Sequence, residues 1–235
     1  MLLSRTRQTI IRRFKEFVFD KGGFQKVLDV RDKHQLEDAM GFRGQFEEHR
    51  RFQIALLKEQ GLAPCHRLLE IGCGPLTGGL PIIEFLGPGN YVGIDVRDRV
   101  LDMSWKEIGR QRLSKKNPQL ICSGSFGSAE LGSQQFDFIL SFSVLYHLSD
   151  DLLTSYFGEV RKRLKPTGVC LANVNTLYEN SRWLEFPFLK RTNEEYYDVA
   201  GSHGLAGMSL GELGELGFRL SSAECHNALL SFRIK

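Results

Sequence analysis

The stretch LLEIGCGPLTGG, residues 68–79, decides the fold that this 235-residue chain is expected to adopt. An acid, Glu70, stands inside a short apolar run, and four glycines follow it within nine residues. A short apolar run that ends in glycines is typical of a buried strand that turns tightly into a helix. Because the acid precedes the glycines, the turn favours a ligand that brings positive charge to it.

Short apolar runs alternate with helical patterns along the rest of the chain. The predicted strands cover residues 67–72, 91–95, 119–124, 136–144, 169–175 and 226–234. The predicted helices cover residues 77–87, 99–113, 150–164 and 193–204, with Ser149 as the N-cap of the third and the turn KPTG, residues 165–168, at its end. This alternation predicts an α/β fold, Rossmann-like and doubly wound, with helices on both faces of a mostly parallel sheet. Ligands of such a fold lie beyond the carboxyl ends of the strands.

The first part of the chain has a different pattern, which predicts helices and no strands. Phe52, Ala55 and Leu56 follow the helical spacing of i, i+3 and i+4, and Gly61 is placed to end that helix. We therefore expect residues 1–62 to form an N-terminal helical extension that covers the ligand site. Residues 63–235 would form the main domain.

Composition excludes several classes of protein. The formal net charge of +3 is too small to indicate a nucleic-acid partner, and no apolar run is long enough to span a bilayer. Five cysteines without C-x-x-C spacing predict a reduced, cytoplasmic protein without a structural metal site. The basic segment MLLSRTRQTIIRRFKEF, residues 1–17, predicts an amphipathic helix on the domain, with contact to a membrane surface as the weaker alternative. The sequence does not predict the oligomeric state.

The spacing of the glycines discriminates between two ligands. A dinucleotide motif, G-x-G-x-x-G, would need a third glycine where Thr77 stands, and Glu70 would repel a pyrophosphate, so NAD is disfavoured. S-adenosylmethionine carries a sulfonium and an ammonium group, which a carboxylate attracts. Asp95, 21 residues after Gly74, ends the second predicted strand, where an acid accepts hydrogen bonds from a ribose diol.

At this point four segments in register resemble the class I S-adenosylmethionine-dependent methyltransferases of the small-molecule type. They are residues 70–74 (EIGCG), 93–95 (GID), 136–141 (FDFILS) and 164–168 (LKPTG), and the resemblance covers roughly residues 66–175. It implies a seven-stranded sheet, S-adenosylmethionine as the cofactor and S-adenosylhomocysteine as the product. Two positions depart from the family pattern: Thr167 replaces a common glycine, and Ser125 stands where many relatives have an acid that holds the adenine amino group.

The resemblance also implies the cofactor-binding residues. They are Glu70, Gly72, Cys73, Gly74, Asp95, Val96, Ser125, Phe126 and Ser141, with Arg43 as a candidate for the methionine carboxylate and a solvent-exposed arginine as its alternative role. No metal is expected.

Methyl transfer is an in-line displacement, so alignment supplies most of the rate, and a hydroxyl acceptor gains further from a base. His147, just beyond the fourth predicted strand, is the candidate base, because an imidazole titrates near neutrality. Its alternative role is to brace the next helix cap. Tyr146, Asn175 and Trp183 are candidates for substrate contacts, with packing or turn roles as alternatives.

Residues 176–200 are expected to form a lid or substrate region. Its basic and aromatic residues would line the acceptor: Arg182, Trp183, Phe186, Phe188, Lys190 and Arg191. We therefore predict methyl transfer to a small molecule, at a hydroxyl of a sugar or secondary metabolite. Alternatives are an N-methyltransferase, an RNA or protein methyltransferase, and a catalytically silent cofactor-binding scaffold.

Overall fold

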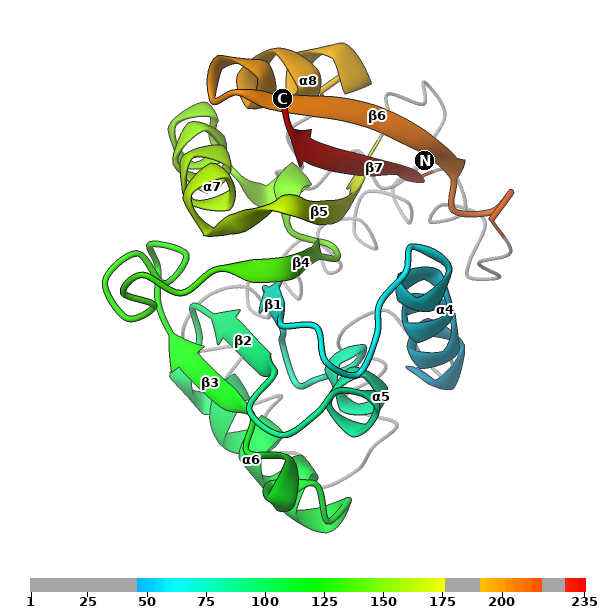
Figure 1. Cartoon of the computed structure of the whole chain (residues 1–235), viewed down its shortest axis with the longest axis vertical. Helices are drawn as coiled ribbons and strands as arrows, with labels where there is room; N and C mark the ends of the chain where they lie inside the picture. Colours follow the sequence, from blue (N-terminus) through cyan, green and yellow to red (C-terminus); the bar gives the residue numbers. More distant parts are fainter. Residues whose placement is uncertain (1–45, 176–190, 217–226) are drawn as a thin grey trace, which may run out of the picture. The chain divides into compact units, whose positions relative to one another are not determined.

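Seven strands of the computed structural model form one sheet in the order β3-β2-β1-β4-β5-β7-β6 (Figure 1). The structure describes residues 46–175, 191–216 and 227–235, and the chain divides into two compact units, 1–47 and 48–235. The strands are β1 (Leu68–Ile71), β2 (Tyr91–Asp95), β3 (Gln119–Cys122), β4 (Phe136–Ser141), β5 (Leu164–Asn175), β6 (Leu205–Glu212) and β7 (Asn227–Ile234). The helices are α4 (Phe46–Glu59), α5 (Gly79–Phe85), α6 (Asp98–Arg110), α7 (Asp150–Arg163) and α8 (Asn193–Ser202), with short 3-10 turns at η1 (Ser114–Lys116) and η2 (Leu145–His147).

The order in which strands are added to the sheet changes direction at β1: β2 and β3 lie on one side of it, and β4 lies on the other. Strand β1 pairs in parallel with β2 on one side, where Leu69 lies opposite Val92, and with β4 on the other, where Leu69 lies opposite Ile139. All residues of β1 and β2 are buried, as expected for parallel strands covered on both faces. The switch point therefore lies between β1 and β4, where the predicted ligand site begins.

Helices pack beside both halves of the sheet. Figure 1 shows α5 and α6 beside β1, β2 and β3, and α7 and α8 beside β5, β6 and β7. Because the crossovers proceed in opposite directions from β1 and β4, right-handed connections place α5 and α7 on opposite faces. The predicted fold class is confirmed. None of the helices in the described ranges is long and apolar enough to cross a membrane.

Capping residues in the sequence stand at several of the observed helix ends. The side chain of Ser149 accepts a hydrogen bond from the amide of Leu152 and caps α7 as predicted. Gly61, with φ of +93°, follows the end of α4 as predicted. Thr192 and Glu195 form a capping box that starts α8.

Two differences from the predicted elements concern strands. β6 was not located from the sequence pattern, because this edge strand is only partly buried and its apolar signal is weak. The turn expected at residues 165–168 falls within β5, which begins at Leu164 directly after α7. Leu164 pairs with Phe136 and Val169 pairs with Phe138, so residues 165–168 form an irregular insertion opposite Asp137. A Cβ at Gly168 would lie 2.8 Å from a Leu164 methyl and 2.9 Å from the carbonyl oxygen of Asp137, so this irregular start of the strand needs glycine.

Candidate active site

The loop after β1 contains two glycines in the left-handed region of φ. Gly72 and Gly74 have φ values of +77° and +52°, which L side chains rarely adopt. A Cβ at Gly72 would lie 2.4 Å from a methyl of Val144, whereas a Cβ at Gly74 would meet nothing within 4 Å. The space beside Gly74 is therefore open to a ligand. The Cys73 thiol packs against Gly93 inside the fold, so only the backbone of Cys73 is placed to face a ligand.

The carboxylate of Glu70 is buried beneath this loop. It accepts a hydrogen bond of 2.5 Å from the hydroxyl of Tyr91, and the same oxygen approaches the start of α5 at Gly79. Burial, with a smaller contribution from the nearby charge of Asp95, raises the pKa of Glu70 to about 8 despite this hydrogen bond. A cation beside Glu70 would favour its charged form.

Both carboxylate oxygens of Asp95 accept hydrogen bonds from the protein. The amide of Gly74 donates to Oδ2 at 3.0 Å, which joins the loop after β1 to the end of β2. The amide and Nε of Arg97 donate to Oδ1 at 3.0 and 2.8 Å, and Nη2 of Arg97 donates to Oδ2 at 3.1 Å. Arg97 was not among the predicted site residues, yet its side chain and amide fill both oxygens of this acid.

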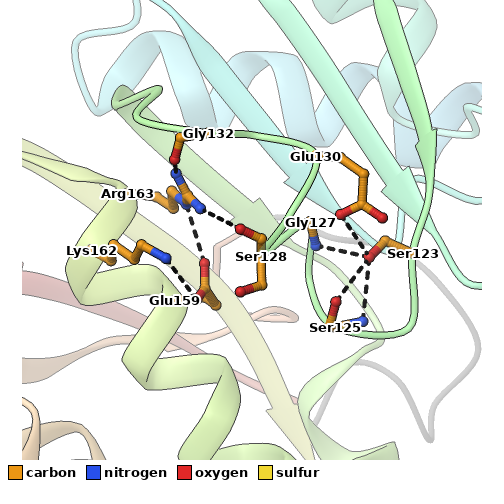
Figure 2. Close-up of polar contacts among 9 residues, drawn as sticks. All are labelled: Ser123, Ser125, Gly127, Ser128, Glu130, Gly132, Glu159, Lys162 and Arg163. Carbon is orange, nitrogen blue, oxygen red and sulfur yellow. Dashed lines mark hydrogen bonds and ion pairs between the residues drawn. The ribbon is translucent and has the colours of Figure 1, made fainter.

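The loop after β3 is folded around one serine (Figure 2). Oγ of Ser123 accepts hydrogen bonds from the amides of Ser125 and Gly127 and lies 3.3 Å from a carboxylate oxygen of Glu130. This arrangement positions Ser125 and Phe126, which were expected to meet the cofactor. Ser125 Oγ lies 3.2 Å from Ser123 Oγ.

Helix α7 holds the far side of the same loop. Arg163, only 2% exposed, donates from its guanidinium to the carbonyl oxygens of Gly132 and Ser128, at 3.0 Å for Ser128, and pairs with Glu159 at 3.1 Å (Figure 2). Its neighbour Lys162 also contacts Glu159, but its side chain is exposed. A buried arginine that satisfies two loop carbonyls fixes the loop in one conformation.

The end of β4 is also fixed by packing against α7. Oγ of Ser141 lies 2.8 Å from the hydroxyl of Tyr156, and the Tyr156 ring packs edge-on against Phe126. Ser141 is fully buried, so its hydroxyl serves this contact. Beyond it, the amide of Ser143 donates to Oδ1 of buried Asn173 at 2.6 Å. Asn173, which sequence reasoning missed, is an amide inside an apolar strand pattern.

Strained backbone is concentrated at this edge of the sheet. Leu76, Phe126 and Ser143 have φ values of +59°, +55° and +57°, in the loops after β1, β3 and β4. Such conformations cost on the order of 1–3 kcal/mol each and persist where the surroundings enforce them, often at binding sites. The other described non-glycine residues with positive φ, Arg112 and Asn117, lie in the turns between α6 and β3.

His147 ends the short turn η2 at the same edge. It is exposed, and its ring centroid lies 4.7 Å from that of the buried Tyr146. Although the residue reaches the surface, protein atoms surround much of its ring, and this burial, together with the positive charge of Arg97, lowers the pKa of His147 to about 4. The ring is therefore neutral at pH 7.

Helix α4 contacts the glycine loop. Nε of Arg50 donates to the carbonyl oxygen of Thr77 at 3.1 Å, and a Cβ at Gly78 would lie 1.8 Å from the buried amide oxygen of Gln53. The Phe52 ring packs on Phe142, after β4, with centroids 6.2 Å apart. These contacts were not predicted individually, although helical spacing places residues 50 and 53 on one face of α4.

The remaining predicted site residues fall in different places. Val96 is 66% exposed directly after β2, where an apolar ligand face would meet it. Asn175 ends β5 and lies opposite Asn227 of β7. Arg191 is buried and bonded to Asp150 and to the carbonyl oxygen of Leu148, so it anchors the segment before α8. Arg43 and the expected lid residues Arg182, Trp183, Phe186, Phe188 and Lys190 lie outside the described residues.

These residues fit S-adenosylmethionine. Glu70 offers a buried carboxylate whose charge a cation would stabilise, and Gly74 leaves open space beside its backbone. The carboxylate of Asp95 could accept hydrogen bonds from the ribose once the Arg97 side chain has moved away from it. Among the residues that the structure describes, no group of three metal-ligating side chains occurs.

Comparison with known sequences points to one family. Residues 69–170 match the family model described as a methyltransferase domain. The chain is 29% identical over 119 residues to a sterol 24-C-methyltransferase of Schizosaccharomyces pombe, covering 51% of this chain and 30% of that protein. It is 29% identical over 141 residues to a phosphoethanolamine N-methyltransferase of Plasmodium falciparum, covering 57% of this chain and 51% of that protein. The chain thus matches about a third to a half of the length of these relatives.

Solved structures share the fold at low sequence identity. A magnesium protoporphyrin IX methyltransferase from Synechocystis, with S-adenosylhomocysteine bound, superposes with a TM-score of 0.67 and 13% identity, over 97% of this chain and 100% of that chain. An S-adenosylmethionine-dependent methyltransferase from Clostridium acetobutylicum gives 0.63 and 14%, over 80% and 92%. Residues 69–170 thus match a methyltransferase domain, and the chain shares its fold with solved S-adenosylmethionine-dependent methyltransferases.

Proposed function

We propose that the protein methylates a hydroxyl group of a small molecule, such as a sugar or a secondary metabolite, with His147 accepting the proton. S-adenosylmethionine, when bound, supplies a methyl group that is already activated for transfer. The chain's residues must then hold the cofactor, align the acceptor and remove its proton. The observation that carries the proposal is an accessible, neutral imidazole beyond β4, at the carboxyl edge of the sheet.

The cofactor is proposed to be held by three groups of residues. Glu70 would face the ammonium end, and Asp95 would accept hydrogen bonds from the ribose. Ser125 and Phe126 would meet the adenine, from a loop fixed by Ser123 and Arg163. The buried position of Glu70 and Asp95, each 4% exposed, supports this assignment, because hydrogen bonds to a carboxylate gain strength away from water.

The protonation state of His147 determines what it can do for the acceptor. With a pKa near 4, the ring is ready to accept a proton at neutral pH, but it is a weaker base than an ordinary imidazole. It would therefore receive the proton late, as the new carbon–oxygen bond forms and the hydroxyl becomes strongly acidic. This timing suits an acceptor whose proton leaves only with methyl transfer.

A second candidate is transfer to an amine nitrogen. The lowered pKa of His147 favours it, because a neutral amine needs no base before the bond forms. The relative named as a phosphoethanolamine N-methyltransferase supports it as well. In this case, His147 would accept a hydrogen bond from the amine and orient it.

Transfer of a labelled methyl group tests both candidates. The full chain is incubated with methyl-labelled S-adenosylmethionine and with methyl glucoside, catechol or phosphoethanolamine as probe acceptors. Label on a hydroxyl oxygen supports the proposal, and label on the nitrogen of phosphoethanolamine overturns it in favour of the second candidate. Binding of S-adenosylhomocysteine by calorimetry, without transfer to these probes or to a metabolite extract, would instead identify a cofactor-binding scaffold.

A further inference from the structure

The carboxylate of Asp95 has no acceptor position left for a ribose. A carboxylate offers about four lone-pair positions. The four hydrogen bonds from the protein fill them: one comes from the Gly74 amide, one from the Arg97 amide and two from the Arg97 side chain. A diol can therefore bind this acid only after at least one donor has left.

The Arg97 side chain is the donor that can leave. The two amides belong to the backbone at the ends of β1 and β2, where moving them would disturb the sheet. The Arg97 side chain is 35% exposed, whereas that of Asp95 is 4% exposed. A half-exposed arginine recovers its hydration when it swings out, so its departure costs less than moving a strand end.

We propose that the Arg97 side chain competes with the cofactor ribose for Asp95 and thereby lowers the affinity for S-adenosylmethionine and its product. The inference rests on the proposed function, because it requires the ribose to bind at Asp95. When a closed arrangement excludes a ligand, the apparent dissociation constant rises by the inverse of the open fraction. Arg97 would thus set how tightly the product is held and how readily it leaves.

A purely structural ion pair predicts the opposite result. If Arg97 only stabilised the end of β2, its removal would loosen Asp95 and weaken cofactor binding. If Arg97 contacted the bound cofactor directly, its removal would weaken binding as well. Competition is the arrangement in which loss of the side chain strengthens binding.

Calorimetry with S-adenosylhomocysteine separates these cases. We expect Arg97→Ala to lower the dissociation constant by about two- to fivefold, the range for release of a partly exposed ion pair. Arg97→Lys should fall between the two proteins, because one ammonium cannot hold both oxygens of Asp95. Arg99→Ala is the matched control, since it removes the same charge from an exposed position two residues along, and it should leave the affinity unchanged.

A second pair of probes tests the ribose itself. Adenosine should bind more tightly to Arg97→Ala than to the unmodified protein. 2′,3′-Dideoxyadenosine has no diol that could donate hydrogen bonds to Asp95, so its affinity should be the same for both proteins. An unchanged or weaker affinity in Arg97→Ala would overturn the inference, as would an equal gain in Arg99→Ala. Failure of the unmodified protein to bind S-adenosylhomocysteine would overturn the proposed function and the inference with it.

Discussion

The hydroxyl of Tyr91 donates a 2.5 Å hydrogen bond to Oε2 of Glu70, and both side chains are buried between the start of β2 and the middle of β1. This hydrogen bond favours the ionised carboxylate, but burial outweighs it and raises the pKa of Glu70 to about 8. Burial and the charge of Glu70 raise the pKa of Tyr91, so its hydroxyl remains a donor. Glu70 is therefore largely protonated at pH 7 until a cation approaches it.

Cofactor binding should release a proton from Glu70. An ammonium group stabilises the carboxylate, so the affinity for S-adenosylhomocysteine should rise with pH from 6 to 8, by at most about tenfold per unit, and level off above 8. The charges facing Glu70 include Asp95, which opposes its ionisation. Calorimetry in buffers of different ionisation enthalpy measures the proton release directly.

Tyr91→Phe supplies the matched variant, because it removes only the hydroxyl that favours the charged form. The pKa of Glu70 should rise, and the pH dependence of binding should move to higher pH. The coupling between cofactor binding and ionisation of Glu70 would be refuted if binding released no proton and if the affinities of the unmodified protein and Tyr91→Phe were equal from pH 6 to 8.

The same shift predicts how Glu70 affects stability without ligand. Because the pKa of Glu70 in the folded protein, about 8, lies above its ordinary value of 4.5, its contribution to stability is present in full below pH 4.5 and is lost as pH rises to about 8. Glu70→Gln should therefore melt at a higher temperature than the unmodified protein at pH 8 and at a similar one at pH 4.5. Thermal unfolding at the two pH values checks this, and an equal difference at both would exclude titration of Glu70 as the cause.

Asp95→Asn should weaken binding of S-adenosylhomocysteine by about 1.5–3 kcal/mol, the range for hydrogen bonds to a charged group. The amide keeps the size of the carboxylate but offers one acceptor oxygen in place of two. Asp98→Asn, at an exposed position on the first turn of α6, is the control and should bind normally. Unaltered binding in Asp95→Asn would remove this acid from the cofactor site.

The sequence predicted those features of the candidate site that depend on local pattern. Gly72 and Gly74 were found because a tight turn after a buried strand needs them, and Asp95 because it ends the next strand. The missed parts depend on the conformation of side chains and on contacts between distant segments. Arg97 stands only two residues after Asp95, but no pattern in the sequence shows that its side chain folds back onto that acid. Arg163 contacts the carbonyl oxygen of Ser128, 35 residues away, so its direction depends on the tertiary structure.

Arg163→Met should weaken cofactor binding through the loop after β3. The variant keeps much of the buried volume but leaves the carbonyl oxygens of Ser128 and Gly132 without their donor. We expect the dissociation constant of S-adenosylhomocysteine to rise about five- to thirtyfold, equivalent to roughly 1–2 kcal/mol. Discrimination against S-inosylhomocysteine, which differs only in the base, should decrease as well.

Lys162→Met is the control for this prediction, because Lys162 contacts the same Glu159 from an exposed position. It should leave binding and base discrimination unchanged. A lowered melting temperature in Arg163→Met with normal affinity and discrimination would show that Arg163 stabilises the fold without positioning the loop.

The role of His147 can be decided by combining turnover with stability. If His147 accepts the proton of a hydroxyl acceptor, His147→Ala should lower the turnover rate by roughly 10² to 10⁴ and leave the affinity for S-adenosylhomocysteine nearly intact. His147→Gln should not restore the rate, because an amide accepts a hydrogen bond but cannot take the proton.

The pH dependence sharpens this test of His147. An ordinary imidazole would make the rate rise through about pH 6.5. Because the pKa of His147 is lowered to about 4, the ring is already neutral at pH 6. Titration of His147 should therefore not change the turnover rate at saturating cofactor between pH 6 and 8. Arg97→Ala should raise this pKa, since the charge of Arg97 helps to lower it, and should bring the inflection nearer to neutrality. A full rate in His147→Ala with a lowered melting temperature would show that His147 only braces the start of α7, and an amine acceptor would then be the better assignment.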